Sequence, residues 1–399
     1  MSLTARQLNR ATLGRQMLLG RQGIGVVDAV RAVCALQAQS AASPYIALWN
    51  RITRFDPGEL DAAFAEHRIV KATLIRLTLH AVAADDYPAF LRAMVDDLRR
   101  SRLFDGRYRA TGLSVADADA LIPHALAFAT VARTNAEFDA MLTERVGALP
   151  RPGAWWALRT FAPVVHAPTG GPWLFGDRPS YVASPIEPFA GSREESLPVL
   201  VRRYLEAFGP ASEADFGQFT MIPRPPTRAA LGVLSDQLDT YEGPDGKQLY
   251  DVRGGVVPPD ETPAPPRLMA MWDNVLLAYK DRSRVIPEDY RKLVIRNNGD
   301  TLPTVLVDGY VAGVWRPAPE QAGAIEVTAF QSLDDATWDG LEAEARSLVA
   351  FLAGRQPDVY RRYARWWKTL PSADVRLLAG SPVCGQSGRH QGGGSNQRR

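Results

Sequence analysis

The order in which helical and extended patterns follow one another constrains the fold of this chain most. Apolar residues recur at helical spacing over residues 3–36, with a glycine-rich break at 20–25. Two further short helices are expected, one near Ser43 and one that starts at Asp56-Pro57-Gly58. Residues 73–82 then have an extended pattern. Several short helices followed by an extended segment are typical of a winged helix-turn-helix.

The same order returns further along the chain. Residues 204–218 predict a helix, a Gly-Pro turn and a second helix capped by Ser212, and residues 228–238 predict a third helix. A hairpin around Asp245-Gly246 follows within 239–253. Residues 113–163 are mostly helical before an aromatic, strand-like stretch at 155–161, so a further copy is expected there. We therefore predict tandem winged helices, although no repeat is visible residue by residue.

The pattern changes after a proline-rich linker at 257–266. Two alternating strands flank Asp308-Gly309, a third strand is expected at 324–330, and an amphipathic helix at 334–352. The expected fold class is α+β, with tandem winged helix-turn-helix motifs, a β-rich C-terminal unit and a terminal helix. The expected regions are 1–110 with the first winged helix, 111–256 with further copies, 267–384 with the β-rich unit, and a disordered tail at 385–399.

Composition is that of a globular protein, and it excludes several classes of chemistry. The chain has 399 residues, of which 46% are hydrophobic and 23% charged. Its two cysteines, Cys34 and Cys384, match no metal or disulfide framework, and the five histidines are too scattered for a triad. Phosphate-binding and dinucleotide glycine motifs are missing. We expect no metal and no cofactor. Since neither a signal peptide nor a membrane span is recognisable, we expect a cytoplasmic protein with no membrane partner.

Charge is unevenly placed along the chain, although the formal net charge is only +2. Basic residues are in excess at 280–296, at 361–368, and in a cluster made of Arg99, Arg100, Arg102, Arg107 and Arg109. A fold that brings these segments to one face would bind a polyanion. The alternative for each single cluster is a solvated helix face.

A short run, Gln37-Ala38-Gln39, brings two primary amides close together at the end of a helical pattern. Such a pair can hold a water molecule or a polar base edge, although chance and a solvated helix end also account for it. Residues i and i+2 of a helix lie about 200° apart around its axis. Both amides can therefore face one ligand only if the helix ends at or between them, or continues there as extended chain.

The chain resembles the bacterial winged-helix DNA glycosylase family of AlkZ and YcaQ. The residues that carry the resemblance span most of the chain in order: Ala35-Leu36-Gln37-Ala38-Gln39-Ser40, Arg76-Leu77-Thr78-Leu79-His80, Phe208-Gly209-Pro210-Ala211 with Asp215-Phe216, Trp272-Asp273-Asn274-Val275-Leu276-Leu277-Ala278 with Asp281-Arg282, and Pro303 to Gly309 with Gly313-Val314-Trp315. The resemblance implies tandem winged helices that form a concave DNA-binding channel.

The resemblance also implies an activity and a set of site residues. Gln37 and Gln39 match the family's catalytic Gln-hydrophobic-Gln motif, and Gln39 in place of aspartate is typical of enzymes that unhook azinomycin-type interstrand crosslinks and give self-resistance. The expected partner is double-stranded DNA with alkylated or crosslinked guanine, bound by a monomer. Expected DNA contacts are His80, Arg76, Arg100, Arg102 and the hairpin tip at Asp308 and Gly309, for which an ordinary turn is the alternative.

Amide chemistry fits one class of lesion. An N7-alkylated guanine is cationic and leaves readily, so the enzyme has to orient water and stabilise an oxocarbenium-like sugar. We therefore expect release of N7-alkylpurines and not of uracil. The nearest lysine, Lys71, is expected at a solvated helix end, which makes the enzyme monofunctional. The alternatives are a winged-helix transcriptional regulator without catalysis and a non-catalytic sensor of alkylation damage.

Overall fold

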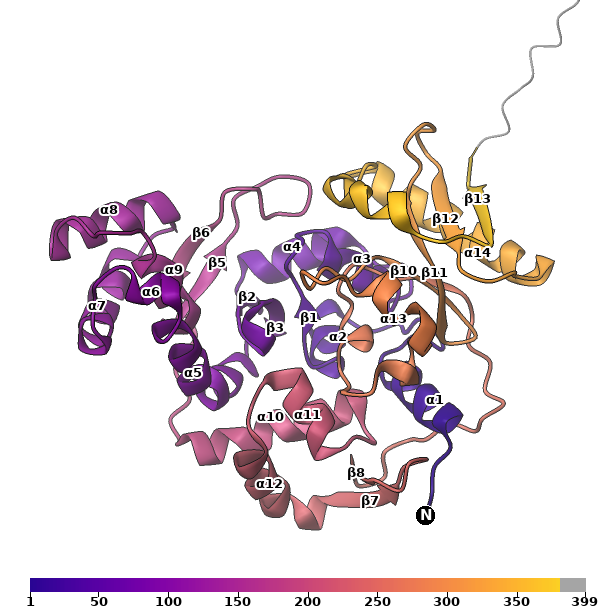
Figure 1. Cartoon of the computed structure of the whole chain (residues 1–399), viewed down its shortest axis with the longest axis horizontal. Helices are drawn as coiled ribbons and strands as arrows, with labels where there is room; N and C mark the ends of the chain where they lie inside the picture. Colours follow the sequence, from indigo (N-terminus) through magenta and orange to yellow (C-terminus); the bar gives the residue numbers. More distant parts are fainter. Residues whose placement is uncertain (381–399) are drawn as a thin grey trace, which may run out of the picture.

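The computed structural model describes residues 1–380, so Cys384 and the predicted tail at 385–399 lie outside the described residues. The described chain is α+β, with helices and small antiparallel sheets, as expected from the sequence. Figure 1 shows three helix-rich parts and a C-terminal sheet. No helix among the described residues is long and apolar enough to cross a bilayer.

The first unit follows α1 (Ala5–Arg15) and supplies the centre of the molecule in Figure 1. Its elements are α2 (Val26–Ala32), β1 (Leu36–Gln37), α3 (Ser43–Trp49), α4 (Pro57–Ala65), β2 (Ile69–Thr73) and β3 (Leu79–Ala83). The strands form an antiparallel sheet in the order β1-β3-β2. Asp56 caps α4 through the backbone N–H of Gly58, as its sequence predicts.

The second unit repeats this order of elements. After α5 (Tyr87–Leu103) and α6 (Gly106–Arg109) the chain forms α7 (Val115–Phe128), β4 (Arg133–Thr134), α8 (Asn135–Val146), α9 (Ala154–Phe161), β5 (Val164–Ala167) and β6 (Ser180–Ala183). Its sheet has the corresponding order, β4-β6-β5. This unit forms the violet lobe on the left of Figure 1.

The third unit has the same arrangement. Its elements are α10 (Arg193–Phe208), α11 (Glu213–Thr220), α12 (Arg224–Val233), β7 (Leu238–Glu242) and β8 (Gln248–Val252). Ala211, which lies between α10 and α11, pairs with Tyr250 of β8 and so takes the place of the first strand. Ser212 caps α11 and Asp245-Gly246 lies in the hairpin turn, both as predicted, and Asp215 completes a capping box with Ser212.

The C-terminal unit contains β9 (Arg267–Leu268), α13 (Glu288–Val294), β10 (Thr304–Val307), β11 (Tyr310–Pro317), β12 (Ile325–Ala329), α14 (Asp335–Ala353) and β13 (Asp374–Leu378). The five strands are ordered β13-β12-β11-β10-β9. Asp308 and Gly309 join β10 to β11 with positive φ of 48° and 83°, as a type I′ turn requires. The segment between β9 and β10 carries the 3-10 turns η3 (Asn274–Leu276) and η4 (Arg282–Arg284), and η5 (Arg361–Thr369) follows α14.

Two apolar clusters hold these parts together. One cluster joins the helices of the first unit to the C-terminal sheet and α14, and includes Trp49, Trp315 and Leu348. The other joins the opposite side of the first unit to α5 and to the second and third units, and includes Phe90, Trp155 and Tyr204. The first unit is therefore covered from both sides. The predicted region boundaries are not tested by these clusters and stay a prediction.

Two secondary-structure predictions were wrong. Residues 73–82 are not one extended segment, because the 3-10 turn η1 (Ile75–Leu77) divides β2 from β3. Arg76 and Leu77 adopt positive φ there without a glycine signal, and the Thr78 hydroxyl closes the turn on the carbonyl of Ile75 at 2.9 Å. The aromatic stretch 155–161 is helical, because its buried residues Ala154, Ala157, Leu158 and Phe161 follow helical spacing. Aromatic strand propensity is weaker than this burial pattern.

Candidate active site

The two glutamines follow helix α2, and neither belongs to it. The helix ends at Ala32, Cys34 has a left-handed φ of 68°, and Leu36 and Gln37 form β1 opposite Ala81 and His80 of β3. The chain then bends at Gln39 and Ser40. The helix thus ends earlier than the sequence indicated, at Ala32 and before both amides, and Gln37 lies on extended chain.

The two amides nevertheless lie in different surroundings. The Gln37 side chain is buried, with 5% of its surface exposed, and borders a small cavity of about 10 Å³. Gln39 is exposed and lines a much larger groove of about 800 Å³. One hydrogen bond connects them, because the backbone N–H of Gln39 donates to Oε1 of Gln37 at 2.9 Å. Gln37 thus holds the bend from which Gln39 reaches the groove.

A buried polar network supports the strand of Gln37. Arg51 donates to both carboxylate oxygens of Asp273 at 2.8 and 2.9 Å, and each side chain is only 1% exposed. Asn274 donates to the carbonyl of Ala35 at 2.9 Å. Asp273 and Asn274 therefore support the fold beside the glutamines.

The groove is basic and aromatic. The first unit contributes Gln39, Lys71 and Thr73 among others, and the polar and aromatic residues from other parts of the chain include Arg102, Trp156, Arg159, His166, Tyr181, Arg361, Arg362 and Tyr363. Arg102 lies over the ring of Trp156 at 4.4 Å. The carboxylate of Asp177 is the one acidic group among the described residues that line this groove. Two of the basic segments found in the sequence, around Arg102 and around Arg361, therefore meet here.

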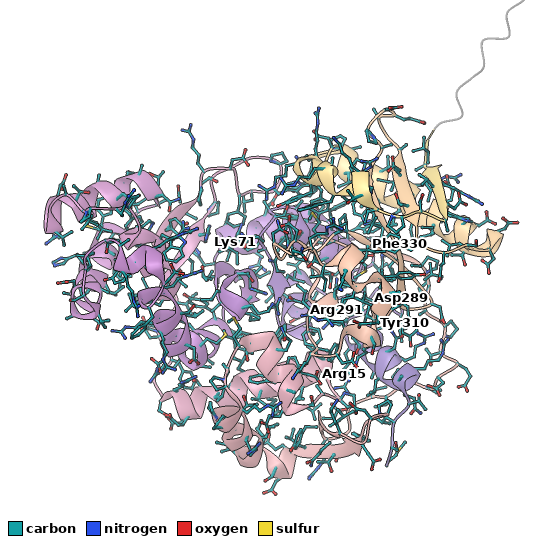
Figure 2. All side chains as sticks on the ribbon, viewed as in Figure 1. Arg15, Lys71, Asp289, Arg291, Tyr310 and Phe330 are labelled. Carbon is teal, nitrogen blue, oxygen red and sulfur yellow. The ribbon has the colours of Figure 1, made fainter. Side chains whose placement is uncertain are left out.

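Lys71 corrects one expectation from the sequence. It lies in β2 and not at a solvated helix end, and its side chain is 6% exposed and lines the same groove as Gln39. Figure 2 labels it on the side of the central sheet that faces β5 and β6. Burial lowers the pKa of Lys71 to about 8. The structure therefore places an amine on the wall of the groove that Gln39 lines.

His80 and Arg76 point to the interior. His80 is buried, its Nδ1 lies 3.2 Å from the carbonyl of Thr78, and burial lowers its pKa to about 3, so the ring is neutral. Arg76 donates to the carbonyl of Phe219 and to the side-chain oxygen of Asn274, both at 3.2 Å, and burial lowers its pKa to about 9. In this structure both side chains connect elements of the fold.

The other residues expected to contact DNA are divided between two environments. Asp308 forms ion pairs with Arg6, at 2.7 Å, and with Arg10, and Asn9 donates to the carbonyl of Gly309 at 2.9 Å. The hairpin tip is therefore attached to α1. Arg100 is exposed on α5 and lies outside the groove, whereas Arg102 lines it and donates to Thr160 at 3.2 Å.

Sequence reasoning missed the part of the groove that the second unit supplies. Trp156 and Arg159 are three residues apart on α9, so they lie on one helix face. His166 and Tyr181 are opposite one another on β5 and β6, and their rings are 4.6 Å apart. Burial, followed by the charge of Lys71, lowers the pKa of His166 well below its usual value. The spacing of Trp156 and Arg159 could have shown from the sequence that both side chains lie on one helix face. It was missed because residues 155–161 were predicted to be a strand.

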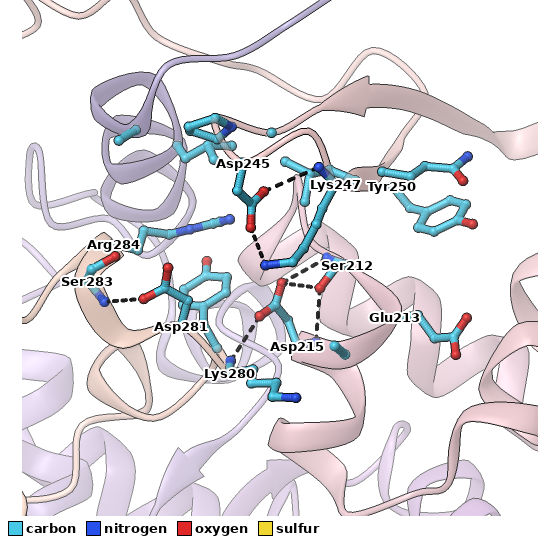
Figure 3. Close-up of a pocket in the computed structure, with 18 of the residues that line it drawn as sticks. Ser212, Glu213, Asp215, Asp245, Lys247, Tyr250, Lys280, Asp281, Ser283 and Arg284 are labelled. Atoms are coloured by element: carbon cyan, nitrogen blue, oxygen red, sulfur yellow. Dashed lines mark hydrogen bonds and ion pairs between the residues drawn. The ribbon is translucent and has the colours of Figure 1, made fainter.

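A second cleft of about 730 Å³ lies between α1, the third unit and η4 (Figure 3). Charged side chains in this cleft form ion pairs, Lys247 with Asp245 and Arg228 with Glu213 at 3.2 Å, and Asp215 accepts from the backbone N–H of Lys280 at 2.9 Å. Asp281 accepts from the backbone N–H of Ser283 at 2.9 Å. Basic and acidic groups alternate in this cleft, and the glutamine motif is elsewhere, so the groove at Gln39 is the better candidate for an active site.

A basic and aromatic groove suits a polyanionic partner, and the comparisons with known proteins identify the class. A family model described as DNA glycosylase AlkZ-like matches residues 30–351. The chain therefore belongs to the AlkZ-like DNA glycosylase family, and it is a DNA glycosylase.

Two individual relatives are similar over most of the chain. The interstrand DNA cross-link repair glycosylase of Streptomyces sahachiroi is 26% identical over 369 residues, which cover 86% of this chain and 95% of the relative. The solved structure of the DNA glycosylase AlkZ from Streptomyces sahachiroi matches with a TM-score of 0.75 at 21% identity. That match covers 90% of this chain and 99% of the solved one, and it shows a shared fold.

Proposed function

We propose that the enzyme hydrolyses the N-glycosidic bond of N7-alkylated purines in double-stranded DNA, including purines joined in azinomycin-type interstrand crosslinks. One observation carries the proposal: the exposed side chain of Gln39 lines a groove in which the lining residues within 1–380 include several arginines and a single carboxylate. The relative from Streptomyces sahachiroi is named for cross-link repair, which supports the same substrate class. The cellular role would be DNA repair and self-resistance to crosslinking agents.

The chemistry follows from the charge of the substrate. A purine alkylated at N7 is already cationic, so its departure needs little protonation, and the barrier lies in the developing cation on the sugar. The carbonyl oxygen of Gln39 can accept a hydrogen bond from the attacking water and can face this cation with its partial negative charge. Gln37 acts as a positioning residue, because its Oε1 fixes the backbone N–H of Gln39.

The walls of the groove suit a DNA strand. Arg102, Arg159, Arg361 and Arg362 would pair with phosphates, and exposed Arg100 would extend this contact beyond the groove. The half-buried Trp156 offers aromatic surface for stacking of bases. His80, Arg76, Asp308 and Gly309 have other partners in the protein, so we assign them to support of the fold.

We further propose that the three repeated units are tandem winged helices around a concave channel. Each unit has the element order of a winged helix, with its first strand paired to the third. The groove lies between the first unit, the second unit and η5. Because a crosslinked guanine stays attached to both strands, we expect the enzyme to act in this open channel without full extrusion of the nucleotide.

Release of base from duplex DNA tests the proposal. Wild-type protein should release N7-methylguanine and should unhook an azinomycin crosslink, but should not release uracil. Gln39→Ala should lower release by about 10²-fold or more, by analogy with the loss of one stabilising group in other active sites. Gln331→Ala removes an exposed glutamine in the C-terminal unit and is the matched control, which should keep full activity.

Asp177, the carboxylate of the groove, allows the amide mechanism to be compared with general-base catalysis by a carboxylate. If Asp177 activated the water, Asp177→Asn would abolish release and Gln39→Ala would have little effect. The proposal predicts the reverse. A winged-helix regulator would bind DNA and release no base from either lesion.

A further inference from the structure

Lys71 has surroundings unlike those of a lysine that binds phosphate. Its Nζ lies 4.4 Å from the ring centre of Phe175, and no hydrogen bond or ion pair of Nζ is found within residues 1–380. The side chain is 6% exposed, yet it borders the groove. A cation held for electrostatic binding is normally solvated, whereas this amine is covered by an aromatic ring and has no acidic partner.

The sheet connects Lys71 to the glutamines. Lys71, Ala81 and Leu36 form one row across β2, β3 and β1, and Thr73 is opposite Leu79 further along. Thr73 and Leu79 also line the groove, and the backbone N–H of Ala38 donates to the carbonyl of Leu79. Lys71 and Gln39 therefore lie on one continuous surface.

Lysine is rare in this sequence, so its presence at position 71 is informative. The chain has five lysines, which leaves 46 − 5 = 41 arginines, and Lys71 is the one lysine that lines the groove. Arginine always carries its charge and cannot act as a nucleophile, whereas a desolvated lysine can. With a pKa of about 8 in place of 10.5, the neutral fraction of Lys71 near pH 7 rises by ~300-fold.

We propose that Lys71 captures the abasic deoxyribose, the product of base release, as a Schiff base. This inference rests on the proposed function, which supplies the abasic sugar. The ring-opened sugar exposes an aldehyde at C1′, to which the neutral Nζ adds. The resulting carbinolamine loses one water molecule, and the C1′–Nζ imine remains. The step needs no oxidant or reductant, and hydrolysis of the imine returns both partners.

Borohydride trapping on a preformed abasic site tests the inference. A duplex with one uracil is first treated with uracil-DNA glycosylase, so that the abasic site exists before the protein is added. The wild-type chain with sodium borohydride should give a covalent protein–DNA adduct on a denaturing gel. Lys71→Arg and Lys71→Ala should each give at least about tenfold less adduct, because neither side chain can form the imine.

Three controls distinguish a requirement for the Lys71 amine from an effect of its charge or of protein folding. Lys292→Arg changes an exposed lysine on α13 and should leave the adduct unchanged. Lys71→Arg keeps the positive charge and should bind abasic DNA with wild-type affinity. Peptide mapping of the trapped wild-type protein, which does not depend on any variant, should place the reduced adduct on Lys71.

The inference would be wrong if the wild-type protein gave no adduct, if Lys71→Arg still gave the adduct, or if the adduct mapped to another amine. Because the abasic site is supplied in advance, this test does not depend on base release. A protein that failed to release N7-methylguanine but was trapped through Lys71 would contradict the proposed function alone. One that released the base but was never trapped would contradict this inference alone.

Discussion

Gln37 and Gln39 are two residues apart, but the structure gives them different environments, so their substitutions should differ. Gln37→Met keeps the volume of the side chain and removes the acceptor for the Gln39 N–H. We expect kcat for base release to fall roughly 10- to 100-fold, because small displacements of a reacting group have effects of this size. The DNA affinity should stay near wild type, since Gln37 is buried.

Gln37→Glu keeps an acceptor for the same N–H and should restore part of the lost kcat. Single-turnover kinetics together with equilibrium binding separate the two quantities. If Gln37→Met weakened DNA binding and left kcat unchanged, the positioning role would be refuted.

His80 should make the protein sensitive to acid. Its pKa in the folded state is about 3, lowered first by burial and then by Arg76, against about 6.5 when unfolded. Between these values the unfolded chain binds the extra proton, so stability is present above pH 6.5 and is lost as the pH falls toward 3. From about pH 7.5 to about 5.5, His80→Gln should lose about 1 kcal/mol less stability than wild type. Urea unfolding at the two pH values measures this difference, and equal losses in both proteins would contradict it.

At the scale of elements, the Arg51–Asp273 pair fastens α3 to the segment that supports β1. Arg51→Met leaves a buried carboxylate without a partner, which should cost about 3–5 kcal/mol of unfolding free energy. Arg51→Met/Asp273→Asn removes both charges and keeps an acceptor for the backbone N–H of Val275. The double variant should therefore be more stable than Arg51→Met alone.

An exposed ion pair provides the comparison. Arg346 and Glu342 are one turn apart on α14, at 2.8 Å, and Arg346→Met should change stability by less than about 0.5 kcal/mol. Chemical denaturation of the three variants measures all of these differences. If the double variant were less stable than Arg51→Met, loss of the attraction within the pair, and not the unpaired carboxylate, would account for most of the loss in stability.

Elements with local signals could be predicted from the sequence, and the parts of the site that depend on tertiary packing could not. Asp56 and Ser212 cap helices through their own neighbours, and Asp308-Gly309 fixes its turn by backbone preference. The burial of Gln37 depends on Asp273 and Asn274, more than two hundred residues away. Lys71 is desolvated by a loop between β5 and β6 that carries Phe175, which its sequence neighbourhood does not reveal.

At the scale of the whole molecule, DNA binding should depend on salt through arginines from distant segments. Arg361 is 84% exposed at the side chain and lines the groove together with Arg362. Arg361→Ala/Arg362→Ala should reduce the slope of log affinity against log salt concentration by about 2, since each phosphate contact contributes about 0.9. Arg346→Ala, which changes an exposed arginine outside the groove, should leave the slope unchanged. Equal slopes in all three proteins would remove Arg361 and Arg362 from the interface.

The apolar cluster that joins the first unit to the C-terminal sheet sets the timing of maturation on the ribosome. The first unit is complete at residue 83, but the strands that cover its helices begin with β9 at Arg267. At roughly 5–20 residues per second the intervening chain takes on the order of 10–40 s to be made. During that interval the helices around the glutamine strand have no cover on one side. The groove at Gln39, whose wall includes residues of η5, can therefore be complete only after most of the chain has been made.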